Sequence, residues 1–170
     1  MNISRKNRER LANEIVNGAV LIHGNNSMYR NNDVAYPFRQ DSNFHYLTEW
    51  PEPDAHAVIV IKDSKPELYL FVQDRNLEME TWAGKRIGQE GAVDKYNAKE
   101  AFSNTDYSKK LSELLKSNPK IIFDGVGGNK MAPFLQKQFF SLNDFHSIGI
   151  VEIIFSIKKF RTKSIDSILA

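Results

Sequence analysis

The chain has 170 residues, of which 41% are hydrophobic and 26% are charged, so its composition is that of a folded domain rather than a disordered segment. It contains no cysteine, which excludes disulfides, thiol catalysis and thiolate metal sites, and it has no apolar run long enough to cross a membrane or form a secretion signal. Its net charge of +2 comes from basic ends, at residues 1–10 and 158–170, around a mildly acidic body that lacks the clustered basic face needed for nucleic-acid binding. We therefore expect a cytoplasmic protein that binds neither membranes nor nucleic acid.

The first predicted elements are a helix and a buried strand. Ser4 is a suitable N-cap for a helix that extends to about Val16, and the Asn17-Gly18 pair would end it. The apolar stripe of this helix consists of Leu11, Ile15 and Val16. The apolar run at 19–22 predicts a buried strand, and the polar residues 24–33 predict a loop.

The following stretch is typical of extended structure. Aromatic residues at 44–48 predict a short strand, in which alternation would place Phe44 and Tyr46 on one face. Residues 55–61 and 68–72 predict two strands, and the intervening residues 62–66 have the composition of a hairpin loop. We therefore expect these two strands to be antiparallel.

Helices and strands alternate in the second half of the chain. Helices are predicted at residues 77–82, 98–102, 107–115, 129–140 and 152–157, and strands at 121–123 and 148–151. Gly84, Gly88 and Gly91 are expected to keep the residues around them in a loop, and Asp106 is a candidate N-cap. The order of elements predicts an α/β fold with a mixed sheet flanked by helices, in one domain.

Two candidate ligand sites are weak. Asp54 and His56 would share one face of a strand and His45 lies on a nearby predicted strand, so a three-ligand metal site is conceivable, but incidental polar residues at a strand edge are the better interpretation. The glycine-rich residues 124–128 follow a predicted strand and precede a helix, as in phosphate-binding loops. The spacing of the glycines does not match those motifs, and an ordinary strand-to-helix turn is favoured. No nucleophile motif is present, so we predict no catalytic residue in this chain.

Aromatic residues and arginine crowd residues 30–54. One interpretation is a hydrophobic core with a buried Arg39 paired to Asp33 or Asp41. The other is a binding or assembly surface, because aromatic residues and arginine are enriched at interfaces. A second such place is Trp82, which precedes a basic, glycine-broken loop and either forms a contact site or covers the edge of the sheet.

These two places carry a resemblance to a known family. A first block of residues resembles the signature of the aminopeptidase P amino-terminal domain. Its centre is Tyr36-Pro37-Phe38-Arg39-Gln40-Asp41-Ser42, which is preceded by Arg30 and Asp33 and followed by Phe44, Tyr46-Leu47-Thr48 and Glu52-Pro53-Asp54-Ala55. A second block of that domain is similar to Trp82-x-Gly84-Lys85-Arg86-x-Gly88-x-Glu90-Gly91-Ala92. The resemblance is close over residues 30–102. It departs from the family at Glu49-Trp50, where the family usually has glycine followed by an aromatic or small residue.

The resemblance implies a fold for this chain and places catalysis in a separate domain. The fold would be a creatinase- and prolidase-like amino-terminal domain of ribonuclease H-like topology, covering residues 1–157, with residues 158–170 beginning a linker to a separate catalytic domain. That second domain would hold two divalent metals, typically manganese, and would release an N-terminal residue that precedes proline. We therefore expect this chain to have no metal or cofactor of its own, to be part of a longer protein, and to be inactive alone.

The resemblance also implies partners. The domain would contact its own catalytic domain and neighbouring subunits of a homo-oligomer, and it would restrict the cleft that receives the proline-containing peptide. Candidate substrate-pocket or interface residues are Trp82, Arg39, Tyr36 and Arg86. Two alternatives remain open at this point: a free-standing binding or assembly module without peptidase activity, and a binder of phosphate or nucleic acid through residues 125–128 or the basic ends.

Overall fold

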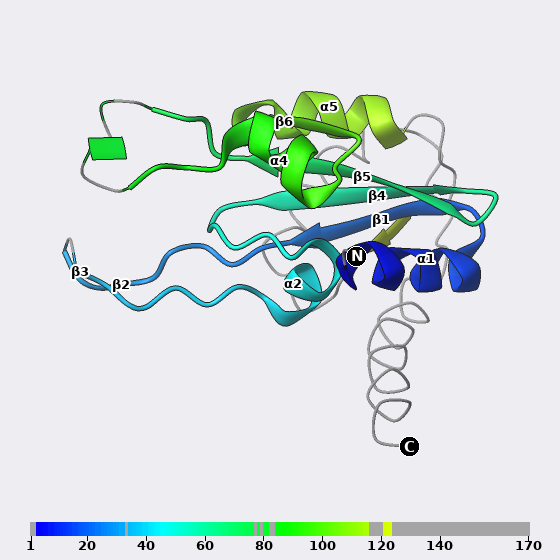
Figure 1. The fold of residues 1–170 in the computed structure, drawn as a ribbon, viewed down its shortest axis with the longest axis horizontal. Coiled ribbons are helices and arrows are strands. Elements are labelled where there is room, and N and C mark those ends of the chain that lie inside the picture. The colour runs from blue at the N-terminus through cyan, green and yellow to red at the C-terminus, as the bar shows by residue number, and fades with distance from the viewer. Residues whose placement is uncertain are drawn as a thin grey trace, which may run out of the picture.

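A mixed β-sheet forms the centre of the molecule (Figure 1). The computed structural model describes residues 3–32, 34–76, 78, 80–81, 84–115 and 121–123. Within them, the main sheet has the order β6-β5-β4-β1-β7. Its strands are β1 (Gly18–His23), β4 (His56–Lys62), β5 (Lys65–Val72), β6 (Glu100–Ser103) and β7 (Ile121–Phe123). The pairs β1–β4 and β4–β5 are antiparallel, whereas β5–β6 and β1–β7 are parallel, which confirms the predicted mixed sheet.

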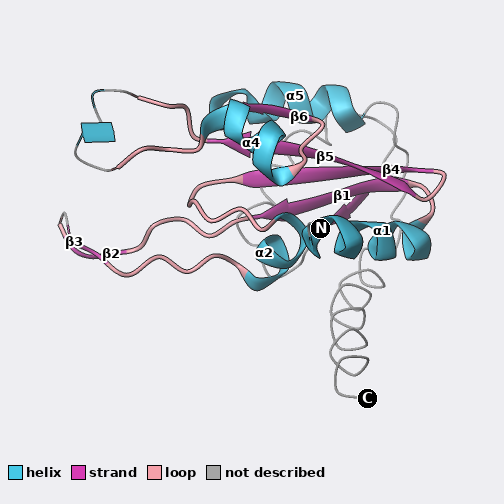
Figure 2. Ribbon diagram, viewed as in Figure 1, coloured by secondary structure: helices cyan, strands magenta, loops and turns pink. Residues whose placement is uncertain are grey.

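Helices cover both faces of this sheet (Figure 2). The helices are α1 (Ile3–Ile15), α2 (Ser42–Thr48), α4 (Gly88–Tyr96) and α5 (Tyr107–Leu115). The first three pack on one face and α5 packs on the other. The α/β class predicted from the element order is therefore confirmed.

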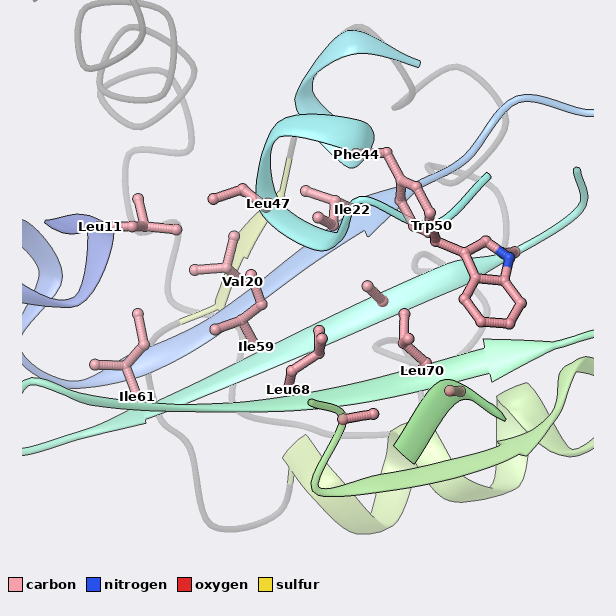
Figure 3. Packing of buried hydrophobic residues seen from close by; sticks show 14 of the residues in the cluster. Leu11, Val20, Ile22, Phe44, Leu47, Trp50, Ile59, Ile61, Leu68 and Leu70 are labelled. Atoms are coloured by element: carbon pink, nitrogen blue, oxygen red, sulfur yellow. The ribbon is translucent and has the colours of Figure 1, made fainter. Parts of the chain in front are cut away.

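The two cores follow from the alternation of side chains along the strands. On the α1 side, Ile22, Ile59 and Leu70 meet the apolar faces of α1 and α2 (Figure 3). On the α5 side, Leu21 and Phe71 lie in the second cluster. The central strands β1 and β4 are buried on both faces, and this is why their sequences are nearly continuous apolar runs.

The segment predicted as a strand at 44–48 is the helix α2, so that prediction was wrong. The Asp41 carboxylate accepts hydrogen bonds of 2.9 Å from the backbone N–H groups of Asn43 and Phe44, which is an N-cap. Phe44 and Leu47 are buried at helical spacing, whereas Tyr46 is only partly buried. Phe44 and Tyr46 therefore do not share a face.

Two predictions around the second glycine-rich block were also wrong. Gly88 and Gly91 lie inside α4 and do not hold a loop. A Cβ at Gly88 would lie 2.7 Å from Arg75 Cγ, so glycine is needed there for close packing, and its φ of +67° also favours glycine. Residues 98–102 do not form a helix, because β6 occupies the edge of the sheet beside β5 from Glu100 onward.

Smaller differences concern the first third of the chain. Ser4 is buried within α1 and does not cap it, and Val16 is exposed with a φ of +62° rather than part of the apolar stripe. The predicted loop at 24–33 contains β2 (Tyr29–Asn31), which pairs with β3 (Val34–Ala35). Ser103, and not Asp106, provides the side-chain cap before α5, at the short 3-10 helix of residues 104–106.

Several predictions fall outside the described residues. They are the helices at 129–140 and 152–157, the strand at 148–151, the glycine loop at 124–128 and the linker at 158–170. The predicted helix at 77–82 is described only at residues 78 and 80–81, which are helical.

Candidate docking surface

Two long loops leave the same end of the sheet (Figure 2). The first arm, residues 24–41, joins β1 to α2 and carries the small β2–β3 sheet. The second arm, residues 73–87, joins β5 to α4. Both contain the residues that the sequence analysis selected as candidates.

The first arm presents large apolar side chains to solvent. Their exposed fractions are 70% for Met28, 63% for Tyr29, 57% for Val34, 53% for Tyr36 and 36% for Phe38. The arm itself is ordered by backbone bonding, because the Tyr36 N–H donates to the Met28 carbonyl at 2.8 Å. A run of exposed aromatic residues on a structured hairpin is a typical contact surface.

The side chain of Gln40 fixes the base of the first arm. Its Oε1 accepts from the backbone N–H groups of Asn25 at 2.8 Å and Asp41 at 2.9 Å. Its Nε2 donates to the carbonyls of Glu52 at 2.8 Å and Trp50 at 3.3 Å. A Cβ on Gly24 would lie 2.9 Å from this amide oxygen, so the chain approaches Gln40 closely at that point.

Asp74 and Glu52 fix the base of the second arm. The Asp74 carboxylate accepts from Ser103 Oγ at 2.7 Å and also from the Gln89 side chain. The Glu52 Oε1 accepts from the Ile87 N–H at 2.8 Å, just before α4. Since the Glu52 carbonyl also accepts from Gln40, residue 52 connects the bases of the two arms.

An ion pair lies within the second arm. Arg75 donates two hydrogen bonds to the Glu80 carboxylate, at 2.8 Å and 3.0 Å. This bidentate contact lowers the pKa of Glu80 and raises the pKa of Arg75. Both groups are therefore charged at neutral pH.

The structure places three of the four candidate residues. Tyr36 and Arg39 are exposed on the first arm, and Arg86 is half-buried, with its Nη1 donating to the Asp74 carbonyl at 3.2 Å. Trp82 lies outside the described residues. The interpretation of Arg39 as a buried residue is wrong, because its side chain is exposed and Asp41 caps α2.

The conceivable metal site is not assembled. His45 lies on the exposed side of α2, and the Asp54 carboxylate accepts from Gln73 Nε2 at 2.7 Å. The His56 imidazole instead faces His23. Among the described residues, no group of three or more histidine, aspartate and glutamate side chains is placed to share a metal ion.

The sequence analysis missed two features of this region. It did not identify Gln40 and Glu52 as the residues that connect the arms, although both lie in the first motif block. It also missed the contact of His23 with His56, which becomes visible once β1 and β4 are paired antiparallel. Chemically, the arms offer aromatic faces and a guanidinium, which suit the binding of a protein or peptide surface.

Known families and proteins resemble this chain in sequence. A family model described as "Aminopeptidase P, N-terminal domain" matches residues 4–123. The Xaa-Pro aminopeptidase of Haemophilus influenzae is 38% identical over 101 residues, which cover 59% of this chain and 24% of that protein. The Xaa-Pro aminopeptidase of Escherichia coli is 33% identical over 113 residues, which cover 65% of this chain and 26% of that protein.

Solved structures show the same fold. Aminopeptidase P from Escherichia coli, in its low-pH form, superposes with a TM-score of 0.77 at 26% identity and covers 84% of this chain and 33% of its own. Aminopeptidase PepP of Pseudomonas aeruginosa gives a TM-score of 0.75 at 29% identity and covers 81% of this chain and 31% of its own. The chain thus spans about a quarter of the length of these curated relatives and about a third of the solved chains.

Proposed function

This chain belongs to the family of aminopeptidase P N-terminal domains, and from that membership we propose that it is the accessory, non-catalytic part of a Xaa-Pro aminopeptidase. In this proposal a separate catalytic domain removes the N-terminal residue that precedes proline. The present domain shapes access to the active site and takes part in oligomer assembly.

The observation that carries this proposal is the pair of arms at one end of the sheet. The first arm exposes Tyr36 and Arg39, and its base is joined through Glu52 to the base of the second arm. Hydrogen bonds that hold the bases of two arms favour a contact surface, because a partner that binds there has less conformational entropy to remove. The proposed partners are the catalytic domain and neighbouring subunits, and the cleft between them would admit the proline-containing peptide.

Metal chemistry is assigned to the catalytic domain in this proposal. The described residues place no shared ligand set for a metal ion, so we derive no metal-dependent step from this chain. Two divalent ions, manganese by the resemblance, would activate water and anchor the free amino group in the catalytic domain. The contribution of this chain would be steric and orienting.

Placement in the cell is part of the same proposal. No helix among the described residues is long and apolar enough to cross a membrane. We propose that the protein acts in the cytoplasm, where short proline-containing peptides would be its substrates.

The test compares two purified proteins with a Xaa-Pro tripeptide and added manganese. One protein is the 170-residue chain, and the other contains the same chain followed by the reading frame downstream of Ala170. We expect cleavage only by the longer protein. Metal-dependent cleavage by the 170-residue chain would overturn the assignment of this chain as non-catalytic.

A second candidate is a free-standing assembly module, and the exposed apolar side chains of the first arm favour it as well. The discriminating observation is the reading frame downstream of Ala170. A frame that continues into a metal-binding peptidase domain supports the leading proposal. A stop codon directly after Ala170 supports the free-standing module.

A further inference from the structure

The second arm extends beyond the end of the sheet, and its two limbs are joined at Glu80 (Figure 1). The outgoing limb, residues 73–76, follows β5, and the return limb, residues 84–87, leads into α4. The Glu80 N–H donates to the Asn76 carbonyl at 2.8 Å, and the Gly84 N–H donates to the Glu80 carbonyl at 3.1 Å. The backbone of Glu80 is therefore bonded to both limbs.

The side chain of Glu80 is bonded to both limbs as well. From the outgoing limb, Arg75 donates its two hydrogen bonds to the carboxylate, at 2.8 Å and 3.0 Å. From the return limb, the backbone N–H of Arg86 donates to the same carboxylate. Only 11% of the Glu80 side chain is exposed, and a bidentate contact between guanidinium and carboxylate fixes direction as well as distance.

The aliphatic stem of Arg75 packs on the start of α4. A Cβ at Gly88 would lie 2.7 Å from Arg75 Cγ and 2.9 Å from Arg75 Cδ, so the stem lies directly against the helix backbone. This part of the arm is itself anchored, since the Ile87 N–H donates to Glu52 Oε1 at 2.8 Å. The Arg75 side chain thus reaches from the anchored base of the arm to Glu80.

We propose that Arg75 is a positioning residue, which holds the return limb of the second arm in place by resting on Gly88 and binding Glu80. The Arg86 side chain belongs to that limb, and its Nη1 donates to the Asp74 carbonyl at 3.2 Å. The role of Arg86 as a contact residue rests on the proposed function, whereas the support of the limb by Arg75 follows from the contacts themselves. Without this support the arm would have more conformational freedom to lose when a partner or peptide binds.

The first test is hydrogen exchange by NMR on the 170-residue chain. In Arg75→Gln, we expect the Arg86 amide to lose protection by about fivefold or more, while the Leu70 amide in β5 keeps its protection. The matched control is Lys99→Gln, which breaks an exposed ion pair of 2.7 Å with Glu67 near the other end of β5. This control should leave the Arg86 amide unchanged. Unchanged protection of the Arg86 amide in Arg75→Gln would overturn the proposal.

A second variant tests whether Arg75 acts through Glu80. Glu80→Gln removes the charge that receives the guanidinium, so it should reduce the protection of the Arg86 amide as well. The double variant Arg75→Gln/Glu80→Gln should lose less than the sum of the two single losses, because both changes remove the same contact. Losses that add in full would mean that the two side chains act independently, and would overturn the proposal.

Kinetics of the longer protein, which contains the reading frame downstream of Ala170, test the consequence for the reaction. Arg75→Gln should raise KM for a Xaa-Pro tripeptide about fivefold and change kcat less than about twofold, because the loosened arm must be ordered when the peptide binds. Lys99→Gln should leave KM unchanged. A lower kcat at unchanged KM would overturn the positioning role in the reaction. If the unmodified longer protein does not cleave the tripeptide, the proposed function fails, and the exchange measurements still decide whether Arg75 holds the limb.

Discussion

The Glu49 carboxylate closes the first turn of α1, because its Oε2 lies 3.3 Å from the backbone nitrogen of Ser4. Glu49 is the left-handed residue that ends α2, with a φ of +56°. The same carboxylate favours the charged form of Arg8, whose guanidinium is buried and donates to the Leu47 carbonyl at 2.7 Å. The residue that departs from the family pattern thus joins the end of α2 to the start of α1.

The first prediction concerns this carboxylate. Glu49→Gln keeps the size of the side chain but removes the charge that faces both the helix N-terminus and Arg8. Burial already lowers the pKa of Arg8 to about 10, so loss of the opposing charge should lower the free energy of unfolding by about 1 kcal/mol. Urea unfolding of the purified chain measures this change.

The matched control for this prediction is Glu9→Gln. Glu9 pairs with Arg5 on the exposed side of α1, at 3.1 Å, and a surface pair of this kind contributes about 0.5 kcal/mol or less. Equal losses of stability in Glu49→Gln and Glu9→Gln would show that Glu49 does not join the two helices.

The second prediction is that the folded chain loses stability in acid. The pKa values of His23 and His56 in the fold, about 3 and about 4, lie below the value of 6.5 in the unfolded chain, so the unfolded chain binds protons first as the pH falls. The stability associated with the neutral pair is complete above pH 6.5 and declines as the pH falls toward 3. Between pH 7 and pH 5, each histidine should lower the free energy of unfolding by about 1–2 kcal/mol.

Urea unfolding at a series of pH values provides the measurement. The slope between pH 7 and pH 5 should become flatter in His23→Phe/His56→Phe and should stay unchanged in His45→Gln. A flat profile for the unmodified chain would mean that both histidines are protonated as easily in the fold as in the unfolded state.

The sheet could be predicted from the sequence because its signals are local. The apolar runs of β1, β4 and β5 and the short turn at Asp63-Ser64 are visible without any knowledge of the tertiary structure. The helix α2 could not be found in this way, since seven residues rich in aromatic side chains also suit a strand. The feature that decides for a helix is the Asp41 cap. It is overlooked when the alternation of apolar residues alone is taken as the sign of a strand.

Long-range pairing explains the remaining differences. Residues 100–103 become a strand because β5 offers them a free edge, and Phe102 packs on Phe71 with ring centroids 5.3 Å apart. The two motif blocks lie on the two arms, but the role of these arms as a site stays a prediction. The sequence could not decide whether Arg39 is buried. Its exposure depends on the path of the first arm, which extends away from the core.

The third prediction tests the cap of α2. Asp41→Ala removes the acceptor for two backbone N–H groups and should lower the free energy of unfolding by about 1 kcal/mol. Asp41→Asn keeps a capping oxygen and should lose less than half of that. Thermal unfolding followed by circular dichroism compares the two, and equal losses would argue that the charge of Asp41 matters more than its capping role.

The fourth prediction concerns the base of the first arm. Gln40→Ala removes the side chain that binds the backbone at Asn25, Asp41 and Glu52, so the arm should open locally more often. Limited proteolysis should then cut within residues 25–39 at least about fivefold faster than in the unmodified chain. The exposed control Asn26→Ala should be cut at the same rate as the unmodified chain. If Gln40→Ala is also cut at that rate, other contacts hold the arm.

The fifth prediction separates the docking role of the first arm from the stability of the fold. Tyr36 and Arg39 are exposed, so Tyr36→Ala and Arg39→Ala should each change the free energy of unfolding of the 170-residue chain by less than about 0.5 kcal/mol. In the longer protein that contains the downstream reading frame, the same changes should lower kcat/KM for a Xaa-Pro tripeptide by about tenfold, since removing one good contact residue costs more than about 1 kcal/mol.

The control for the fifth prediction is Lys62→Ala, an exposed change at the opposite end of β4, which should leave both the free energy of unfolding and kcat/KM unchanged. Unaltered kinetics in both arm variants would remove the first arm from the proposed cleft, and a large loss of stability would show that these side chains belong to the fold.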